Sequence, residues 1–311
     1  MDERSRATST RHFEDRLRAG VFVISAEIVP PVSCEPKHLL QKVLPLRGLA
    51  DAVNLTDGAG ARAHLSALAA ARILVEAGIE PILQLTCRDR NRIALQSDLL
   101  GAAALGIRNL LLLSGDDPSA GDQPETKAVF DLDSRALTET ARMIRDHGEL
   151  PSGQKVAGEA HFFLGAGDIP VDPLVGWVPA TLQKKIAAGT QFVQTQFCMD
   201  VGVVRRYVER LKEAGVEIFL LVGIAPLRSA GSARWMRKNL PGTIIADAVV
   251  ARMEKAADPV AEGRRICAEL IEEVSTIPGV AGVHLMAPNN ASAIPAVIAE
   301  VRPKIRRAAA G

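Results

Sequence analysis

The sequence predicts an α/β protein with a single (β/α)8 barrel, and three observations support this fold class. Short apolar runs of strand length alternate with helical stretches along the 311 residues. Each strand and helix unit takes about 25–30 residues, a spacing typical of parallel strands joined by crossover helices. Several apolar runs end in Gly, Asp, Gln or Thr, so polar groups gather at the carboxyl ends of strands, where a barrel carries its ligand site.

The expected elements follow one another without a break that would indicate a second domain. Strands are expected at 21–29, 51–56, 81–86, 109–113, 162–166, 191–196, 217–223 and 280–286. Helices are expected at 36–46, 62–77, 87–105, 134–147, 182–188, 201–214, 230–239, 258–276 and 291–306. Residues 241–257 have the least regular pattern. Because residues 1–20 are polar, we expect a mobile or helical lead-in over 1–20 and one barrel domain over 21–311.

The clearest strand is Asn109–Leu113, which leads into Ser114-Gly115-Asp116-Asp117-Pro118. An apolar run this short is typical of a parallel strand covered on both faces. Gly115 would let a ligand approach the backbone closely, and Asp116 would place a carboxylate at the barrel mouth. An ordinary turn uses the same residue types, so this segment alone leaves both interpretations open. The long loop at 119–133 favours a functional role, since compact domains seldom carry idle loops of that length.

Glu27 is the only charged residue in the apolar strand Val21–Val29, which ends at Pro30-Pro31. A carboxylate there costs several kcal/mol unless it is paired, hydrated or protonated. One interpretation is a solvent-facing residue on an edge strand. The other is a general acid that apolar surroundings keep protonated.

Composition excludes several functional classes. With 37 basic and 36 acidic residues the formal net charge is +1, which gives no support for nucleic-acid binding. No apolar run reaches the ~18 residues that a membrane span needs, and the charged N-terminus leads into no signal core, so we expect a cytoplasmic protein without a membrane partner. The four cysteines form no CxxC pair, which argues against a zinc site and for small buried thiols, although Cys87 and Cys198 lie near strand ends.

The residues expected at the barrel mouth are those that end the strands. They are Glu27, Thr56, Gln84, Asp116, Gly165, Gln196, Gly223 and Met286. Together they describe a pocket with two carboxylates, several amides and a hydroxyl. This set of residues does not indicate which reaction the pocket would catalyse.

Six motifs, in order and over about residues 20–290, resemble the methylenetetrahydrofolate reductase family. They are Ser25-Ala26-Glu27-Ile28-Val29-Pro30-Pro31, Asn54-Leu55-Thr56-Asp57-Gly58-Ala59, Gln84-Leu85-Thr86-Cys87, Leu113-Ser114-Gly115-Asp116, Lys185-Ile186-Ala187-Ala188-Gly189 leading into Gln194-Thr195-Gln196-Phe197, and Val222-Gly223-Ile224-Ala225-Pro226. Each motif alone is weak. Six in register indicate membership of the family.

The resemblance implies a reaction and a set of roles. FAD would take a hydride from NADH or NADPH and pass it to methylenetetrahydrofolate in one-carbon metabolism. Glu27 matches the general acid, Asp116 the aspartate that binds the pterin and influences the flavin, and Gln196 the glutamine that contacts folate and nicotinamide. Met286 falls at a substrate-contacting position. Flavin-contacting positions are Thr56, Gln84, Ser114, Gly115, Asp116, Gly165, Ala166 and Lys185.

The chain also departs from the family pattern. Familiar bacterial members carry arginine where Ser114 stands and histidine where Gln84 stands. They have a tyrosine and a histidine in the segment 165–168, and an aromatic residue where Met286 stands. The missing arginine would have been a fixed cation for the flavin pyrophosphate, and an arginine of the 88–92 segment could compensate for it.

Three functions therefore stay open. They are an FAD enzyme, which the resemblance favours, a flavin-independent reductase with direct hydride transfer, and a folate-binding partner subunit without activity. The sequence leaves open the choice of NADH or NADPH, the physiological direction and whether the chain forms a homo-oligomer.

Overall fold

The computed structural model describes residues 12–308, and over that range the chain forms the predicted barrel. Eight parallel strands close on themselves: β1 (Val23–Ile28), β2 (Ala52–Leu55), β3 (Pro81–Thr86), β4 (Asn109–Leu113), β5 (Phe163–Asp168), β6 (Phe192–Met199), β7 (Phe219–Ile224) and β9 (Val280–Leu285). Each strand pairs with the next, β1 pairs with β9, and the β5–β6 pairing completes the ring. The two-residue strand β8 (Ile244–Ile245) pairs with the end of β6 and lies outside this ring.

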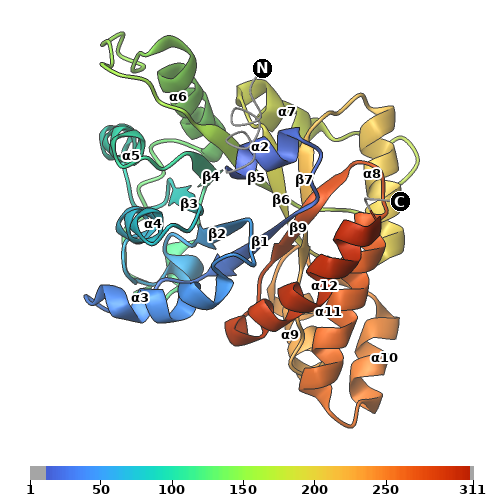
Figure 1. Cartoon of the computed structure of the whole chain (residues 1–311). Helices are drawn as coiled ribbons and strands as arrows, with labels where there is room; N and C mark the ends of the chain where they lie inside the picture. The colour runs from blue at the N-terminus through green and yellow to red at the C-terminus, as the bar shows by residue number, and fades with distance from the viewer. Residues whose placement is uncertain (1–11, 309–311) are drawn as a thin grey trace, which may run out of the picture.

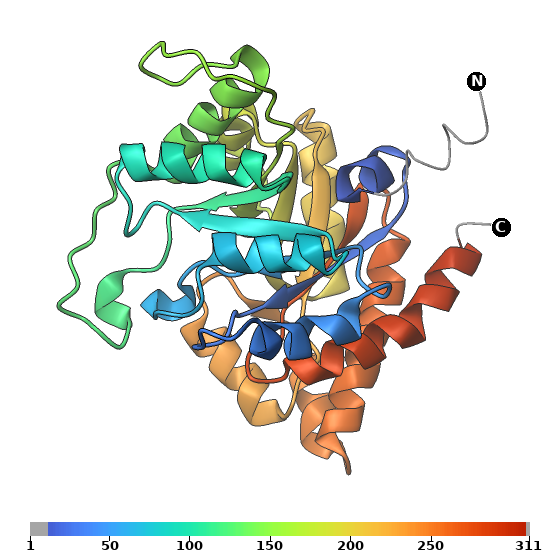
Figure 2. The ribbon, with the colours of Figure 1, turned by 60° about the vertical axis from the view of Figure 1, so that its left-hand side comes forward.

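Helices surround the strands, as Figures 1 and 2 show. They are α2 (Phe13–Arg18), α3 (Pro36–Val43), α4 (Ala67–Glu76), α5 (Arg92–Ala104), α6 (Ser134–His147), α7 (Ala180–Ala188), α8 (Val201–Glu213), α9 (Ala230–Asn239), α10 (Asp247–Lys255), α11 (Pro259–Ser275) and α12 (Ile294–Ala308). Short 3₁₀ turns lie at Leu44–Leu46 (η1), Ala59–Ala61 (η2), Pro118–Ala120 (η3) and Ala291–Ala293 (η4). Within residues 12–308, no helix is both long and apolar enough to cross a bilayer.

Two of the differences between the expected elements and the structure have clear local reasons. The irregular stretch 241–257 contains α10, which the sequence obscures because only Val250 and Met253 of its nine residues are buried. The helix expected at 62–77 starts later, at Ala67. His64 holds the preceding residues in a loop, because its Nε2 accepts from the Gly58 N–H at 2.9 Å and its Nδ1 donates to the Leu65 carbonyl.

Buried apolar side chains fill the amino-terminal end of the barrel, and we call this cluster the aromatic floor. The side chains of Phe163 and Phe192 stack with ring centroids 4.9 Å apart. Phe13 of α2 packs edge-on against both rings, and Leu17 joins the same cluster. The described part of the lead-in is therefore part of the barrel, and residues 1–11 lie outside the described range.

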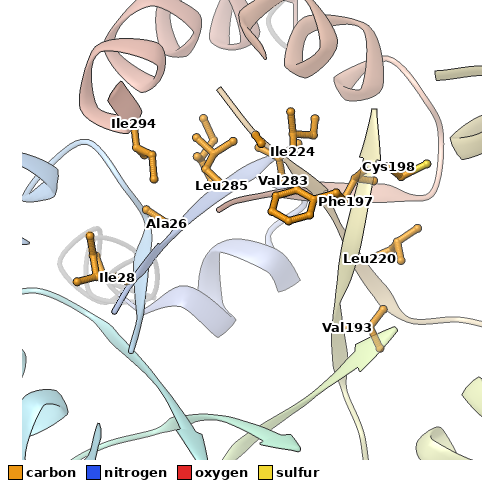
Figure 3. Close-up of a cluster of buried hydrophobic side chains, with 14 of the residues drawn as sticks. Ala26, Ile28, Val193, Phe197, Cys198, Leu220, Ile224, Val283, Leu285 and Ile294 are labelled. Carbon is orange, nitrogen blue, oxygen red and sulfur yellow. The ribbon is translucent and has the colours of Figure 1, made fainter. Parts of the chain in front are cut away.

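The outer faces of the strands pack against the helices in the main hydrophobic core. Figure 3 shows part of it, with Ala26 and Ile28 of β1 and Val283 and Leu285 of β9 near Ile294 of α12. Strand residues alternate between this core and the barrel interior, as expected for parallel strands. In β1 the even-numbered residues face outward, so Val23, Ser25 and Glu27 all face inward.

Candidate active site

A layer of buried polar side chains lies directly above the aromatic floor. Asn54 Nδ2 donates to Gln194 Oε1 at 2.6 Å, and Gln194 Nε2 donates back to Asn54 Oδ1 at 3.0 Å. Gln194 Nε2 also donates to Ser25 Oγ at 3.0 Å, and Ser25 Oγ lies 2.9 Å from His284 Nδ1. Because each member finds partners within the layer, this network can stay buried without a large cost.

Glu27 lies above this layer, inside the barrel, with 23% of its side chain exposed. Its strand is paired on both sides, to β2 and to β9, so the interpretation as an edge-strand residue is wrong. Gln84 Nε2 donates to Glu27 Oε2 at 3.0 Å, and His284 Nε2 lies 3.6 Å from the same oxygen. The structure thus brings the predicted residues Glu27 and Gln84 together and adds His284.

Asp116 lies on the loop after β4, where it is exposed. Its Oδ2 accepts a hydrogen bond from the Gly60 N–H at 2.8 Å, which joins the loops after β2 and β4. Ser114 is also exposed, and Gly115 has φ +94°, a backbone conformation that favours glycine. The long loop that follows extends outward from the barrel (Figure 2).

Thr56 is buried at the end of β2, 3.5 Å from His64 Nε2. The next residue, Asp57, accepts hydrogen bonds from the N–H and hydroxyl of Thr86 and a bidentate pair from Arg90. Asp57 therefore links the ends of β2 and β3 to the start of α5.

None of the three arginines that follow β3 is free of an intramolecular partner. Arg88 is buried and donates to the Gly58 carbonyl at 2.9 Å. Arg90 binds Asp57 and Asp98, and Arg92 binds Asp131. An arginine of this segment was predicted to compensate for the arginine missing at Ser114, but each of the three already binds another group of the protein.

At β5 the predicted positions divide between two sides of the strand. Gly165 faces inward, where a Cβ would lie 2.3 Å from the Phe192 ring, so the absence of a side chain serves barrel packing. Ala166 faces outward into the main core, and only its backbone is available to the mouth. Lys185 of α7 donates to the Gly167 carbonyl at 2.5 Å, so its ammonium lies at the carboxyl end of β5.

The same strand end holds a partly buried carboxylate. Burial raises the pKa of Asp168, while a hydrogen bond from Tyr207 and the nearby charge of Lys185 act in the opposite direction. Burial likewise raises the pKa of Cys87 to about 11 and that of Cys198 to about 12, so both are neutral thiols at pH 7.

Gln196 lies on β6, the next strand of the ring, and both Gln196 and Met286 lie beside Gly223. The register of β6 against β7 shifts at residues 194–197, and the Gln196 side chain accepts from the Phe197 N–H at 3.0 Å. A Cβ on Gly223 would lie 2.8 Å from both the Gln196 carbonyl oxygen and Met286 Cε. Gly223 therefore allows β6, β7 and β9 to approach each other closely.

A pocket of about 450 Å³ opens beside these strands, between the loops after β7 and β9. Its lining includes Arg228, Ser232 and Met236, together with Trp235, which is 53% exposed. Arg228 also donates to the Asn289 carbonyl, which ties the two loops together. An indole next to a guanidinium suits a ligand with an aromatic ring and a carboxylate.

Sequence reasoning missed His284, the buried network and this pocket. A lone histidine in the apolar run 280–286 and a lone tryptophan in a polar helix were the available signals. His284 lies within β9 and Trp235 within α9, so neither belongs to the residues that end strands.

This arrangement is that of a (β/α)8 barrel with a carboxyl side chain inside its mouth, the end at which barrels of this class carry their ligand site. A family model described as "Methylenetetrahydrofolate reductase" matches residues 12–302. The chain belongs to the methylenetetrahydrofolate reductase family.

Curated relatives agree with this assignment. Methylenetetrahydrofolate reductase 1 of Schizosaccharomyces pombe is 27% identical over 167 residues, which cover 52% of this chain and 26% of that protein. The 5,10-methylenetetrahydrofolate reductase of Salmonella typhimurium is 26% identical over 157 residues, covering 50% of this chain and 47% of that one. The matches thus span between a quarter and a half of these relatives.

In fold, the chain is similar to a Clostridium thermocellum protein described as binding two copies of 5-methyl-5,6,7,8-tetrahydrofolic acid. That comparison has a TM-score of 0.66 at 12% identity and covers 94% of this chain and 99% of the other.

Proposed function

We propose that this protein reduces 5,10-methylenetetrahydrofolate to 5-methyltetrahydrofolate with a hydride from NADH or NADPH. The observation that carries the proposal is Glu27, a carboxyl group inside the barrel mouth of a chain from this family, with Gln84 donating to one of its oxygens. We place the reaction in the cytoplasm, as the sequence predicts.

The chemistry needs a proton at one nitrogen and a hydride at one carbon. A proton from Glu27 goes to the folate amine N10, and the bond from N10 to the bridging methylene breaks. The methylene then remains on N5 as an iminium carbon, which accepts the hydride and becomes the methyl group. Glu27 is left as a carboxylate and regains its proton before the next turnover.

The pocket beside β7 and β9 supports a place for the folate. Its Trp235 offers a stacking surface for the p-aminobenzoyl ring, and Arg228 offers a cation for the glutamate carboxylates. Because β9 is paired with β1, the mouth ends of the two strands are neighbours, and we propose that the pterin end of a folate in this pocket extends toward Glu27.

The residues of the β5–α7 side fit FAD. Lys185 lies at the end of β5, where its ammonium is placed to pair with a phosphate. The loop between β5 and α7 exposes Leu174 and Val178, which suit an apolar ring. When bound, FAD supplies a two-electron carrier that takes the hydride from the nicotinamide and gives it to the folate.

A second candidate is direct hydride transfer from the nicotinamide to the folate without flavin. Two observations favour it, the exposed serine at position 114 and the engagement of Arg88, Arg90 and Arg92 by other groups of the protein. Either path uses Glu27 in the same way.

The visible absorbance spectrum of the purified protein tests the choice. A flavin band that appears on addition of FAD and bleaches with NADH or NADPH under anaerobic conditions would support the flavin path. Folate-dependent nicotinamide oxidation by a colourless protein would support direct transfer. If neither occurs while 5-methyltetrahydrofolate still binds, the protein is a folate-binding partner subunit.

Lys185→Ala is expected to weaken FAD retention by about tenfold, because its ammonium is held at the end of β5. Lys184→Ala, its exposed neighbour on the same helix, is the matched control and should have a smaller effect. Titration of the apoprotein with FAD, followed by fluorescence, measures both. Equal affinity of Lys185→Ala and wild type would remove Lys185 from the cofactor site.

Asp116→Asn is expected to slow the folate step by about tenfold or more while the structure stays intact. The amide oxygen can still accept from the Gly60 N–H, so only the charge at the mouth is lost. Single-turnover reduction of methylenetetrahydrofolate checks this result. Unchanged folate kinetics would show that Asp116 does not act in that step.

A further inference from the structure

We propose that His284 is a positioning residue for Glu27. It acts as a neutral imidazole that directs its Nε2–H toward Glu27 Oε2. The inference rests on the proposed function, in which Glu27 supplies the proton. The buried layer beneath Glu27 then has a role in the reaction, because it orients His284 toward the acid, and this role is distinct from packing.

The hydrogen bonds of the layer determine which nitrogen of His284 carries the proton. The Asn54–Gln194 pair is reciprocal, so the Gln194 amide nitrogen faces Ser25 and donates to its hydroxyl oxygen. The Ser25 hydroxyl has one proton to donate. Its oxygen is 3.4 Å from the Val283 carbonyl, to which it can donate, and 2.9 Å from His284 Nδ1, and we assign the proton to the shorter contact, with Nδ1 as the acceptor. The proton of the neutral ring is therefore on Nε2, the atom that faces Glu27.

Both neighbours of Glu27 contact the same carboxyl oxygen. Gln84 Nε2 lies 3.0 Å and His284 Nε2 lies 3.6 Å from Oε2, whereas within residues 12–308 Oε1 makes no hydrogen bond. Two N–H groups directed at Oε2 make that oxygen the acceptor. The acidic proton is then carried by Oε1, the oxygen left for the substrate.

The separation of 3.6 Å is longer than a hydrogen bond, and this length matters for catalysis. When Glu27 gives up its proton, negative charge develops on the carboxylate and attracts the His284 N–H. The contact therefore becomes stronger as the proton is transferred, and an interaction of this kind accelerates the chemical step. Because only 3% of the His284 side chain is exposed, water weakens this attraction little.

Two substitutions at position 284 separate this role from packing. In His284→Gln the amide nitrogen can reach the place of Nε2 and donate to Glu27. In His284→Asn the shorter side chain reaches only the place of Nδ1, where its amide oxygen can accept from Ser25. We expect His284→Asn to lower kcat for folate reduction by about 10–100-fold. His284→Gln should recover most of that loss. In both variants the affinity for 5-methyltetrahydrofolate, measured by calorimetry, should stay within about threefold of wild type.

Ser25→Ala provides a further test that changes the core less. It removes the donor to Nδ1, so His284 can adopt the other tautomer, and we expect a severalfold loss of kcat. Thermal stability should fall moderately, because Gln194 Nε2 and His284 Nδ1 each lose a partner. This variant keeps the proposal testable if the His284 variants fail to fold.

Equal losses of kcat in His284→Asn and His284→Gln, or full activity of the Asn variant, would overturn the role of His284. Full activity of Ser25→Ala would overturn the argument from the tautomer. A wild-type protein that binds 5-methyltetrahydrofolate and reduces no methylenetetrahydrofolate would instead overturn the proposed function, so the two failures are distinguishable.

Discussion

Glu27→Gln is expected to abolish the reduction of methylenetetrahydrofolate, with a loss of about 10²–10⁴-fold in kcat. The amide has nearly the shape of the carboxyl group and keeps an oxygen that can accept from Gln84. The amide has no acidic proton to give to N10, so the bond between N10 and the methylene stays intact and no iminium carbon forms. The variant should fold like wild type, because no charge pair that ties loops together is removed.

Single-turnover kinetics with methylenetetrahydrofolate measure this loss. If the flavin path holds, nicotinamide oxidation with an artificial electron acceptor should continue at nearly the wild-type rate. Lys184→Ala serves as a control for the purification and assay, since Lys184 is exposed on α7. Survival of the folate step in Glu27→Gln would show that another group supplies the proton.

Phe192→Ala is expected to destabilise the barrel by about 3–5 kcal/mol, because the fully buried ring is stacked on Phe163 and contacts Phe13 of α2. Gly165→Ala should also destabilise it, by about 1–3 kcal/mol, since the new methyl group would lie 2.3 Å from the Phe192 ring. Denaturant unfolding of the two variants gives these values.

The double variant provides the decisive comparison for Gly165. In the Phe192→Ala background the ring is gone, so Gly165→Ala should cost little or even fill part of the cavity. A favourable coupling energy of about 1–3 kcal/mol is expected. If Gly165 is glycine only to admit a cofactor, Gly165→Ala alone would leave the free energy of unfolding unchanged and weaken FAD binding instead.

The fold could be predicted because the barrel repeats a simple physical pattern. β3, β4 and α6 have the predicted bounds, since each is a short apolar run or an amphipathic stretch between clear end signals. The helix α10 was missed because two buried residues are too few to define a period. The role of α2 as part of the floor depends on contacts with β5 and β6, which lie far away in the sequence.

The site could be predicted only in part, and the limit is geometric. Glu27 and Gln84 interrupt or end apolar strands, so residue type alone marks them as unusual. Which interior residues share a level depends on the tilt and register of the strands. Gln194 therefore meets Asn54 and Ser25 across the barrel, although no spacing in the chain relates the three.

The pairing of β1 with β9 places Glu27 against His284, two residues separated by nearly the whole length of the described chain. Contacts this distant in sequence form late in folding, because a large loop must close before they are made. The acid and its partner therefore meet only when the first and last strands of the ring have joined. A barrel that is still open has no complete site, so appearance of reductase activity during refolding would report ring closure itself.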